Sequence, residues 1–152
     1  MMKSLLICLC CAALLGACAP KQCRNVQSVL VMPTAFSTER GAGTAFGADF
    51  METLTTALDN RFKDIKFVQG FSGADQEIII RTVLVDYSEP VISENLMYQG
   101  TGNVEISLRI FTGKGALLEE TYITRDLKKG TREEVIASIV EEAVKFVDRK
   151  CL

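Results

Sequence analysis

The first residues of the chain constrain its fold most, because they decide which part of the sequence has to fold at all. Lys3 gives a short basic start, and an uninterrupted apolar run then extends from Leu5 to Leu15. This run is too short for a membrane-spanning helix, which needs roughly 20 apolar residues. Its length, and the small residues Gly16 and Ala17 that follow it, are typical of a secretory signal peptide. We therefore expect residues 1–17 to be removed.

The end of the apolar run predicts what happens to Cys18. The sequence Leu15-Gly16-Ala17-Cys18 resembles the bacterial lipobox, which has an aliphatic residue, two small residues and the cysteine that accepts a diacylglycerol. The resemblance implies lipidation of Cys18 and a firm anchor of several acyl chains. Ala19 follows the cysteine where an aspartate would retain such a protein at the inner membrane, which implies the periplasmic face of the outer membrane. The alternative is an ordinary secreted protein that is cut near Ala19.

Removal of the signal hardly changes the charge of the chain. Of the 17 basic residues only Lys3 is lost, and the whole chain has a net charge of −2. No basic stripe is present, so we expect no nucleic-acid partner. No second apolar stretch is long enough to cross a bilayer, so the membrane is a partner only through the lipid. We expect a lipidated tether at residues 18–27 and a single periplasmic domain at residues 28–152.

Cysteine usage points to one disulfide. Three of the six cysteines leave with the signal, and Cys18 carries the lipid. Cys23 and Cys151 remain, and outside the cytoplasm such a pair is more often bridged than free. Two free thiols near the chain ends are the alternative. Histidine is absent, and two distant cysteines do not make a zinc site, so we expect no metal and no cofactor besides the covalent lipid.

Apolar residues at helical spacing predict two helices. The first is expected at about residues 44–62 and the second after Thr131, which forms a capping box with Glu134. The first apolar stripe consists of Phe46, Phe50, Leu54, Leu58 and Phe62. The second consists of Val135, Ile136, Ile139, Val140, Ala143, Val144 and Val147.

The remaining apolar segments predict strands. They lie at residues 28–32, 65–68, 77–87, 103–111 and 116–127. In the third segment Ile79, Val83, Val85 and Tyr87 are expected on one face and Ile78, Ile80 and Leu84 on the other. Apolar residues on both faces favour a central position in the sheet. The order β-α-β-β-β-β-α predicts an α+β fold, a two-layer sandwich of one mixed sheet of about five strands with two helices on one face.

Several short stretches resemble a superfamily of periplasmic domains. The stretch Val29-Leu30-Val31-Met32-Pro33, the Ser/Gly loop, the helix from Gly43 to Phe62 and then Phe67-Val68 resemble the TolB amino-terminal domain, CsgG, LpoB and the Pel-polysaccharide lipoprotein PelC. Ala74-Asp75 before Ile78-Ile79-Ile80 resembles the entry into their central strand. Residues 102–118 resemble their last hairpin, although Thr112 replaces the usual acid. The order of elements is also similar to that of the lipoprotein LptE. The resemblance implies an outer-membrane lipoprotein of envelope assembly.

Little in the sequence indicates catalysis. Without histidine the commonest general base is missing, and no Gly-x-Ser-x-Gly elbow is present. Residues 41–44 lack the spacing and the lysine of a P-loop, so a plain loop before the helix is the favoured interpretation. We therefore expect the protein not to be an enzyme.

One long connection is the candidate partner interface. Residues 90–98 join two strands and are longer and more apolar than an ordinary hairpin loop. The candidate contact residues are Val91, Ile92, Leu96, Met97 and Tyr98. The alternative is that these side chains extend the strands and pack on the core. As an interface, the segment fits a structural or assembly subunit of an envelope export or biogenesis machine, which contacts other copies or another envelope protein. A regulatory or carrier lipoprotein that binds a synthase, a transporter or a lipid is the other possibility.

Overall fold

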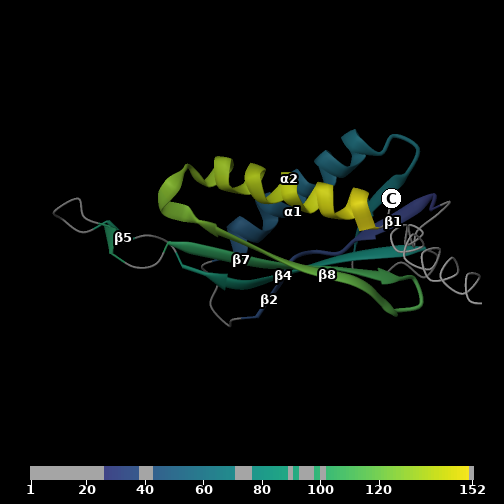
Figure 1. Ribbon diagram of the computed structural model, residues 1–152, viewed down its shortest axis with the longest axis horizontal. Coiled ribbons are helices and arrows are strands. Elements are labelled where there is room, and N and C mark those ends of the chain that lie inside the picture. The colour runs from purple at the N-terminus through teal and green to yellow at the C-terminus, as the bar shows by residue number, and fades with distance from the viewer. Residues whose placement is uncertain are drawn as a thin grey trace, which may run out of the picture.

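The computed structural model describes residues 26–37, 43–70, 77–88, 91–92, 98–99 and 102–150. Two helices lie side by side on one face of a twisted sheet (Figure 1). The predicted fold class, a two-layer α+β sandwich, is confirmed. The elements are β1 (Ser28–Val31), β2 (Ala35–Phe36), α1 (Thr44–Arg61), β3 (Lys66–Gln69), β4 (Ile78–Tyr87), β5 (Val91–Ile92), β6 (Tyr98–Gln99), β7 (Asn103–Thr112), β8 (Leu117–Asp126), a 3-10 turn (Leu127–Lys129) and α2 (Arg132–Lys150).

The main sheet is mixed, as predicted. Its strand order is β3-β1-β4-β7-β8, and the short β2 pairs with the outer half of β4. β1 is parallel to both β3 and β4, whereas β7 is antiparallel to β4 and β8. β4 is therefore central, which agrees with its apolar residues on both faces. The sequence did not predict β2, β5 or β6, each of which is only two residues long.

The hydrophobic core lies between the sheet and the helices. The predicted stripe of α1 is confirmed at Phe46, Phe50, Leu54 and Leu58, all fully buried. Phe62 follows the end of the helix and packs on Phe67, with 6.2 Å between the ring centres. Deep burial of this stripe, more than intrinsic propensity, stabilises a helix of this length.

The second helix begins at the predicted cap. The Thr131 hydroxyl accepts a hydrogen bond from the Glu134 amide at 3.2 Å, and the Glu134 carboxylate accepts one from the Thr131 amide at 2.9 Å. The capping box is thereby confirmed. The core stripe differs from the prediction in one place, because Phe146 is buried and Val144 only partly so.

Ion pairs connect the two helices at both ends. Arg132 near the start of α2 bonds Asp49 near the start of α1 at 2.6 Å, and Arg61 and Asp148 pair at 2.7 Å at the opposite end. The helices therefore run in the same direction. The parallel arrangement follows from the sheet, since β1 and β8 run in the same direction and each helix returns along the sheet after its strand.

A bulge in β4 corrects the predicted direction of Tyr87. Leu84 stands opposite Ile106, but Asp86 stands opposite Glu105, so Val85 is an extra residue without a partner on β7. Such a bulge shifts all later side chains to the other face of the sheet. Tyr87 accordingly turns to the helix side, where its ring centre lies 5.2 Å from that of Phe46. The alternation alone placed it on the wrong face.

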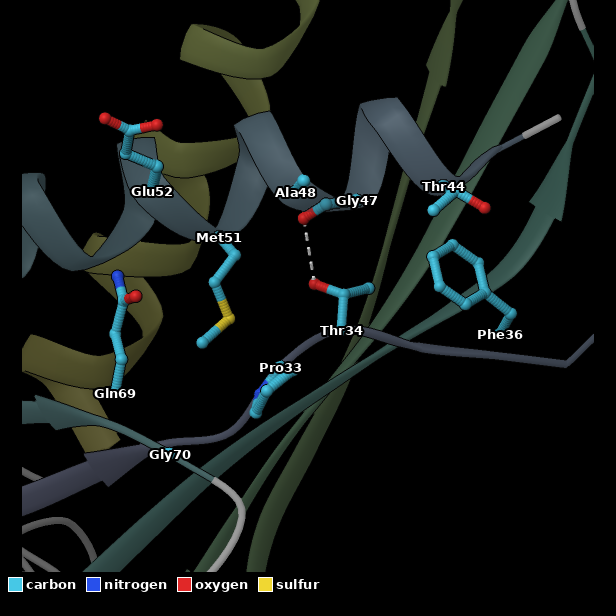
Figure 2. Close-up of a pocket in the computed structure, with 10 residues that line it drawn as sticks. All are labelled: Pro33, Thr34, Phe36, Thr44, Gly47, Ala48, Met51, Glu52, Gln69 and Gly70. Atoms are coloured by element: carbon cyan, nitrogen blue, oxygen red, sulfur yellow. Dashed lines mark hydrogen bonds between the residues drawn. The ribbon is translucent and has the colours of Figure 1, made fainter. Parts of the chain in front are cut away.

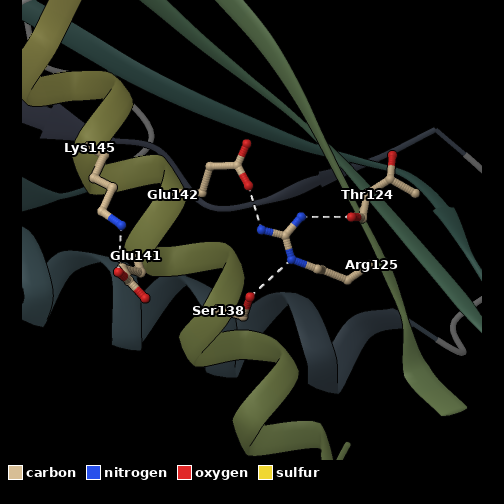
Figure 3. A network of polar contacts seen from close by, with 6 residues as sticks. All are labelled: Thr124, Arg125, Ser138, Glu141, Glu142 and Lys145. Carbon is tan, nitrogen blue, oxygen red and sulfur yellow. Dashed lines mark hydrogen bonds and ion pairs between the residues drawn. The ribbon is translucent and has the colours of Figure 1, made fainter. Parts of the chain in front are cut away.

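Arg125 on β8 ties the edge of the sheet to α2 (Figure 3). Its guanidinium donates to the Ser138 hydroxyl at 3.0 Å and to the Thr124 carbonyl at 2.8 Å, and it pairs with Glu142. Lys145 and Glu141 form a second ion pair on the same helix at 2.6 Å, but both side chains are exposed.

Arg125→Ala is expected to lower the free energy of unfolding by about 1 kcal/mol, because three polar contacts of a half-buried side chain are lost together. Lys145→Ala is the matched control and should cost no more than about 0.5 kcal/mol, as expected of an exposed pair within one helix. Denaturant unfolding of both variants measures the difference. Equal losses in the free energy of unfolding would show that the Arg125 contacts stabilise the fold no more than an exposed ion pair does.

Candidate assembly interface

The predicted interface segment forms a separate small hairpin. β5 and β6 are antiparallel to each other, with Val91 opposite Gln99 and Ile92 opposite Tyr98. β5 lies beyond the end of the main sheet and away from both helices (Figure 1). We call residues 91–99 the arm. Leu96 and Met97 lie outside the described residues, and only the backbone is described at Val91, Ile92 and Tyr98. The proposed contact role of these five residues stays a prediction.

Hydrogen bonds beside the end of β4 and the start of β7 hold the base of the arm. The Ser88 amide donates to the Asn103 carbonyl at 2.9 Å, and the Asn103 amide donates to the Ser88 hydroxyl at 3.1 Å. The Leu127 amide donates to the Gly102 carbonyl. The arm therefore leaves the domain from a fixed point, where an extended segment can reach another molecule.

The sheet face turned away from the helices adjoins the base of the arm. We call it the open face. On β7 the fully buried Ile106, Leu108 and Ile110 point to the helices, so Glu105 and Arg109 must point away from them. Tyr122 on β8 stands opposite Ser107 and is 53% exposed. No helix of the described part of the chain covers this face (Figure 1).

One ion pair fixes the middle of the open face. Arg109 donates to the Glu120 carboxylate at 2.5 Å, and the Ser107 hydroxyl donates to the same carboxylate oxygen at 3.0 Å. The hydrogen bond from Arg109 holds the pKa of the Glu120 carboxyl below its usual value, and the same bond raises the pKa of Arg109. Both groups therefore stay charged at neutral pH. Arg109 on β7 pairs with Glu120 on the neighbouring strand β8. Glu105, which is also on β7, forms no ion pair with Arg109.

A pocket lies on the helix side, where β1 and β3 end beside the first half of α1 (Figure 2). Its volume is about 750 Å³. Pro33, Phe36, Ala48 and Met51 give it apolar walls, and Glu52 and Gln69 lie at its rim. Among the described residues that line the pocket there is no cysteine, serine or lysine, and the polar side chains are those of Thr34, Thr44, Glu52 and Gln69.

The Thr34 hydroxyl is already engaged within the protein. It lies 2.9 Å from the Thr82 hydroxyl and 3.3 Å from the Gly47 carbonyl oxygen, to which it donates. Gly47 lets the loop approach this closely, because a Cβ there would lie 3.0 Å from the Phe36 ring. The described walls of the pocket thus offer apolar contact beside a Thr34 hydroxyl that is already hydrogen-bonded. Sequence reasoning missed it, since it arises where two strand ends meet a helix.

The predicted lipidation and disulfide residues cannot be located. Cys18, Cys23 and Cys151 lie outside the described residues, so their roles remain predictions. In the part of the chain that is described, neither helix combines the length and apolarity needed to span a membrane. Within the same residues, no three acidic or cysteine side chains come together as metal ligands.

Comparisons with known proteins find similarity in the fold and not in the sequence. No protein-family model matches the chain, and a search of curated proteins finds no relative. The PelC dodecamer from Paraburkholderia phytofirmans superposes with a TM-score of 0.61 at 13% identity, over 88% of this chain and 93% of that chain. A point variant of the same PelC dodecamer gives 0.59 at 13% identity, over 89% and 94%. At this identity the likeness concerns the fold alone.

Proposed function

We propose that this chain is a non-catalytic lipoprotein of the outer membrane that serves as a structural or assembly subunit of an envelope export or biogenesis machine. The observation that carries the proposal is the fold similarity to PelC along nearly the whole chain, because the solved PelC structures are dodecamers. We infer by analogy that this chain also contacts further copies, as subunits of a symmetric homo-oligomer do.

Three features of this chain support the proposal independently of PelC. The signal-like start and the lipobox-like Leu15-Gly16-Ala17-Cys18 support a location at a membrane, where envelope machines assemble. The arm projects from the domain at a fixed base, as a contact element would. The absence of histidine from the whole sequence argues against the usual acid–base catalysis.

The pocket favours a second candidate, a carrier or regulatory lipoprotein. A volume of about 750 Å³ is within the range of small-molecule sites, and its walls are partly apolar. This alternative requires one bound molecule or one partner per chain and no second copy. The number of copies in the native protein therefore separates the two candidates.

The arm gives a direct test of the assembly role. Changing Met97 and Tyr98 together to alanine is expected to weaken association with other copies or with an envelope partner, while the melting temperature stays unchanged. The physical reason is that side chains on a projecting hairpin contribute little to the core. Chemical crosslinking in intact cells, run beside thermal melts of the purified domain, measures both effects.

Packing of the Met97 and Tyr98 side chains on the core would give a different result. If these side chains pack on the core, the double change should cost about 2–5 kcal/mol of stability. Leu117→Ala provides a matched control, because Leu117 is an apolar side chain, 53% exposed, on the other end of the sheet. A large fall in melting temperature for the arm variant, with none for the control, would refute the interface role.

A further inference from the structure

The charges on the open face are sorted into separate rows. Arg81 stands opposite Arg109, which we call the basic row, and Asp86 stands opposite Glu105, which we call the acidic row. Val83, Ser107 and Tyr122 form a central row between them. The bulge at Val85 is what brings Asp86 onto this face, so the sorting depends on it.

The sorting is unfavourable for a single chain. Like charges directly opposite on antiparallel strands repel each other, since their Cβ atoms are only about 5 Å apart. Glu120 compensates Arg109. Arg81, Asp86 and Glu105 form no ion pair with any group in the described part of the chain, although Arg81 and Asp86 are exposed and Glu105 is half-buried.

The rows are arranged symmetrically about the centre. On β7, Glu105 and Arg109 lie two residues to either side of Ser107. On β4, Arg81 and Asp86 lie equally far from Val83 once the extra residue of the bulge is discounted. Both rows are thus about 7 Å from the central row, at the usual rise of a strand. A half-turn about an axis along the central row exchanges the positions of the basic and acidic rows.

We propose that a second copy of this chain docks on the open face through a two-fold axis along the Val83–Ser107–Tyr122 row. Arg81 of each copy then faces Asp86 of the other, and Arg109 faces Glu105. The inference deepens the proposed function, on which it rests, by naming one contact surface for self-association. Face-to-face sheets pack about 10 Å apart, a gap that an arginine and a carboxylate fill from opposite sides.

Tyr122 supplies an aromatic contact at the β8 end of the axis. It is 53% exposed in the single chain, and on the two-fold axis it meets its own counterpart. Tyrosine and arginine are enriched among residues that dominate interfaces, especially near the centre. Because the contact is isologous, each ion pair away from the axis occurs twice, so a change in one charged residue has a doubled effect.

Charge reversal tests the pairing of the rows. The mature lipidated protein is extracted in mild detergent, and its association is followed by sedimentation over a dilution series. Arg81→Glu places an acid against Asp86 of the acidic row, and Asp86→Arg places a base against Arg81 of the basic row. Each variant alone should dissociate at a concentration about tenfold higher or more than the unchanged protein. Lys63→Glu, on the helix side and with the same charge change, is the control and should have no effect.

Mixing the two reversed variants gives the decisive result. Their mixture should form a hybrid pair as tight as the unchanged protein, because both ends of the contact are again complementary. Capture on two different affinity tags detects the hybrid. The double variant, with Arg81→Glu and Asp86→Arg in one chain, should also self-associate, and its melting temperature shows that the sheet tolerates the substitutions.

Other outcomes overturn the inference in distinguishable ways. If both reversed variants associate like the unchanged protein, or if their mixture does not recover, the open face is not the contact, although the proposed function stands through another surface. If the unchanged protein is a single copy at every concentration, the two-fold contact is wrong and the assembly-subunit role is contradicted with it.

Discussion

Cys18→Ser is expected to abolish membrane association of the mature protein. The acyl chains on Cys18 are the only apolar anchor predicted after residues 1–17 are removed, and serine offers no thiol for the diacylglycerol. The variant should appear as uncleaved precursor or as soluble periplasmic protein. Fractionation of cells, with mass spectrometry of the amino-terminal peptide, detects the lipid and the processing site together.

The control for this prediction is the other cysteine close to the amino terminus. Cys23→Ser should remain lipidated and membrane-bound, since Cys23 lies outside the lipobox-like sequence. Globomycin, which blocks the lipoprotein signal peptidase, should make the unchanged protein accumulate as precursor. Unaltered processing and membrane binding, both with globomycin and in Cys18→Ser, would exclude the lipoprotein interpretation.

Breaking the predicted Cys23–Cys151 bridge should have the largest effect on stability. A bridge between these residues closes nearly the whole domain, and in the chain-entropy model it contributes about 4–5 kcal/mol. For a domain of this size the loss corresponds to a fall of roughly 10–20 °C in melting temperature. Thermal melts of Cys23→Ser, Cys151→Ser and the double variant measure it.

The pattern among the three variants is the internal control. Each single change breaks the same bond, so the double variant should be no less stable than either single one. Thiol labelling of the denatured, unreduced protein gives an independent check. Two reactive thiols per mature chain would show that the bridge does not exist.

The fold could be predicted from the sequence where local signals agreed. The four-residue spacing of Phe46, Phe50 and Leu54 fixed the buried face of α1, and Thr131 with Glu134 fixed the start of α2. These signals are local, since a helix stripe and its cap depend only on residues a few positions apart.

Features that depend on pairing between strands could not be predicted in the same way. The bulge at Val85 is hidden because β4 is apolar on both faces, so alternation gives no sign of an extra residue. Tyr87 was therefore assigned to the wrong face. The basic and acidic rows also need the register, because Arg81 and Arg109 are far apart in sequence and meet only across β4 and β7.

The sequence predicted which residues form the candidate interface but not the structure that they adopt. The length and apolar character of residues 90–98 indicated a special connection, and the structure gives it the backbone of a projecting hairpin. The sequence could not indicate the hydrogen bonds between Ser88 and Asn103 at its base, which form only when β4 and β7 pair. The pocket beside Thr34 arises likewise from residues of three separate elements.

The mass of the native particle tests the central claim most directly. The mature lipidated protein is extracted from membranes in mild detergent, and light scattering with the detergent contribution subtracted gives the protein mass. An assembly subunit predicts a defined multiple of the single-chain mass, which Cys18→Ser protein should also reach at sufficient concentration. A mass that corresponds to one copy of this chain at all concentrations would contradict the assembly role. One bound lipid, or one synthase or transporter partner, in the same particle would support the carrier or regulatory alternative.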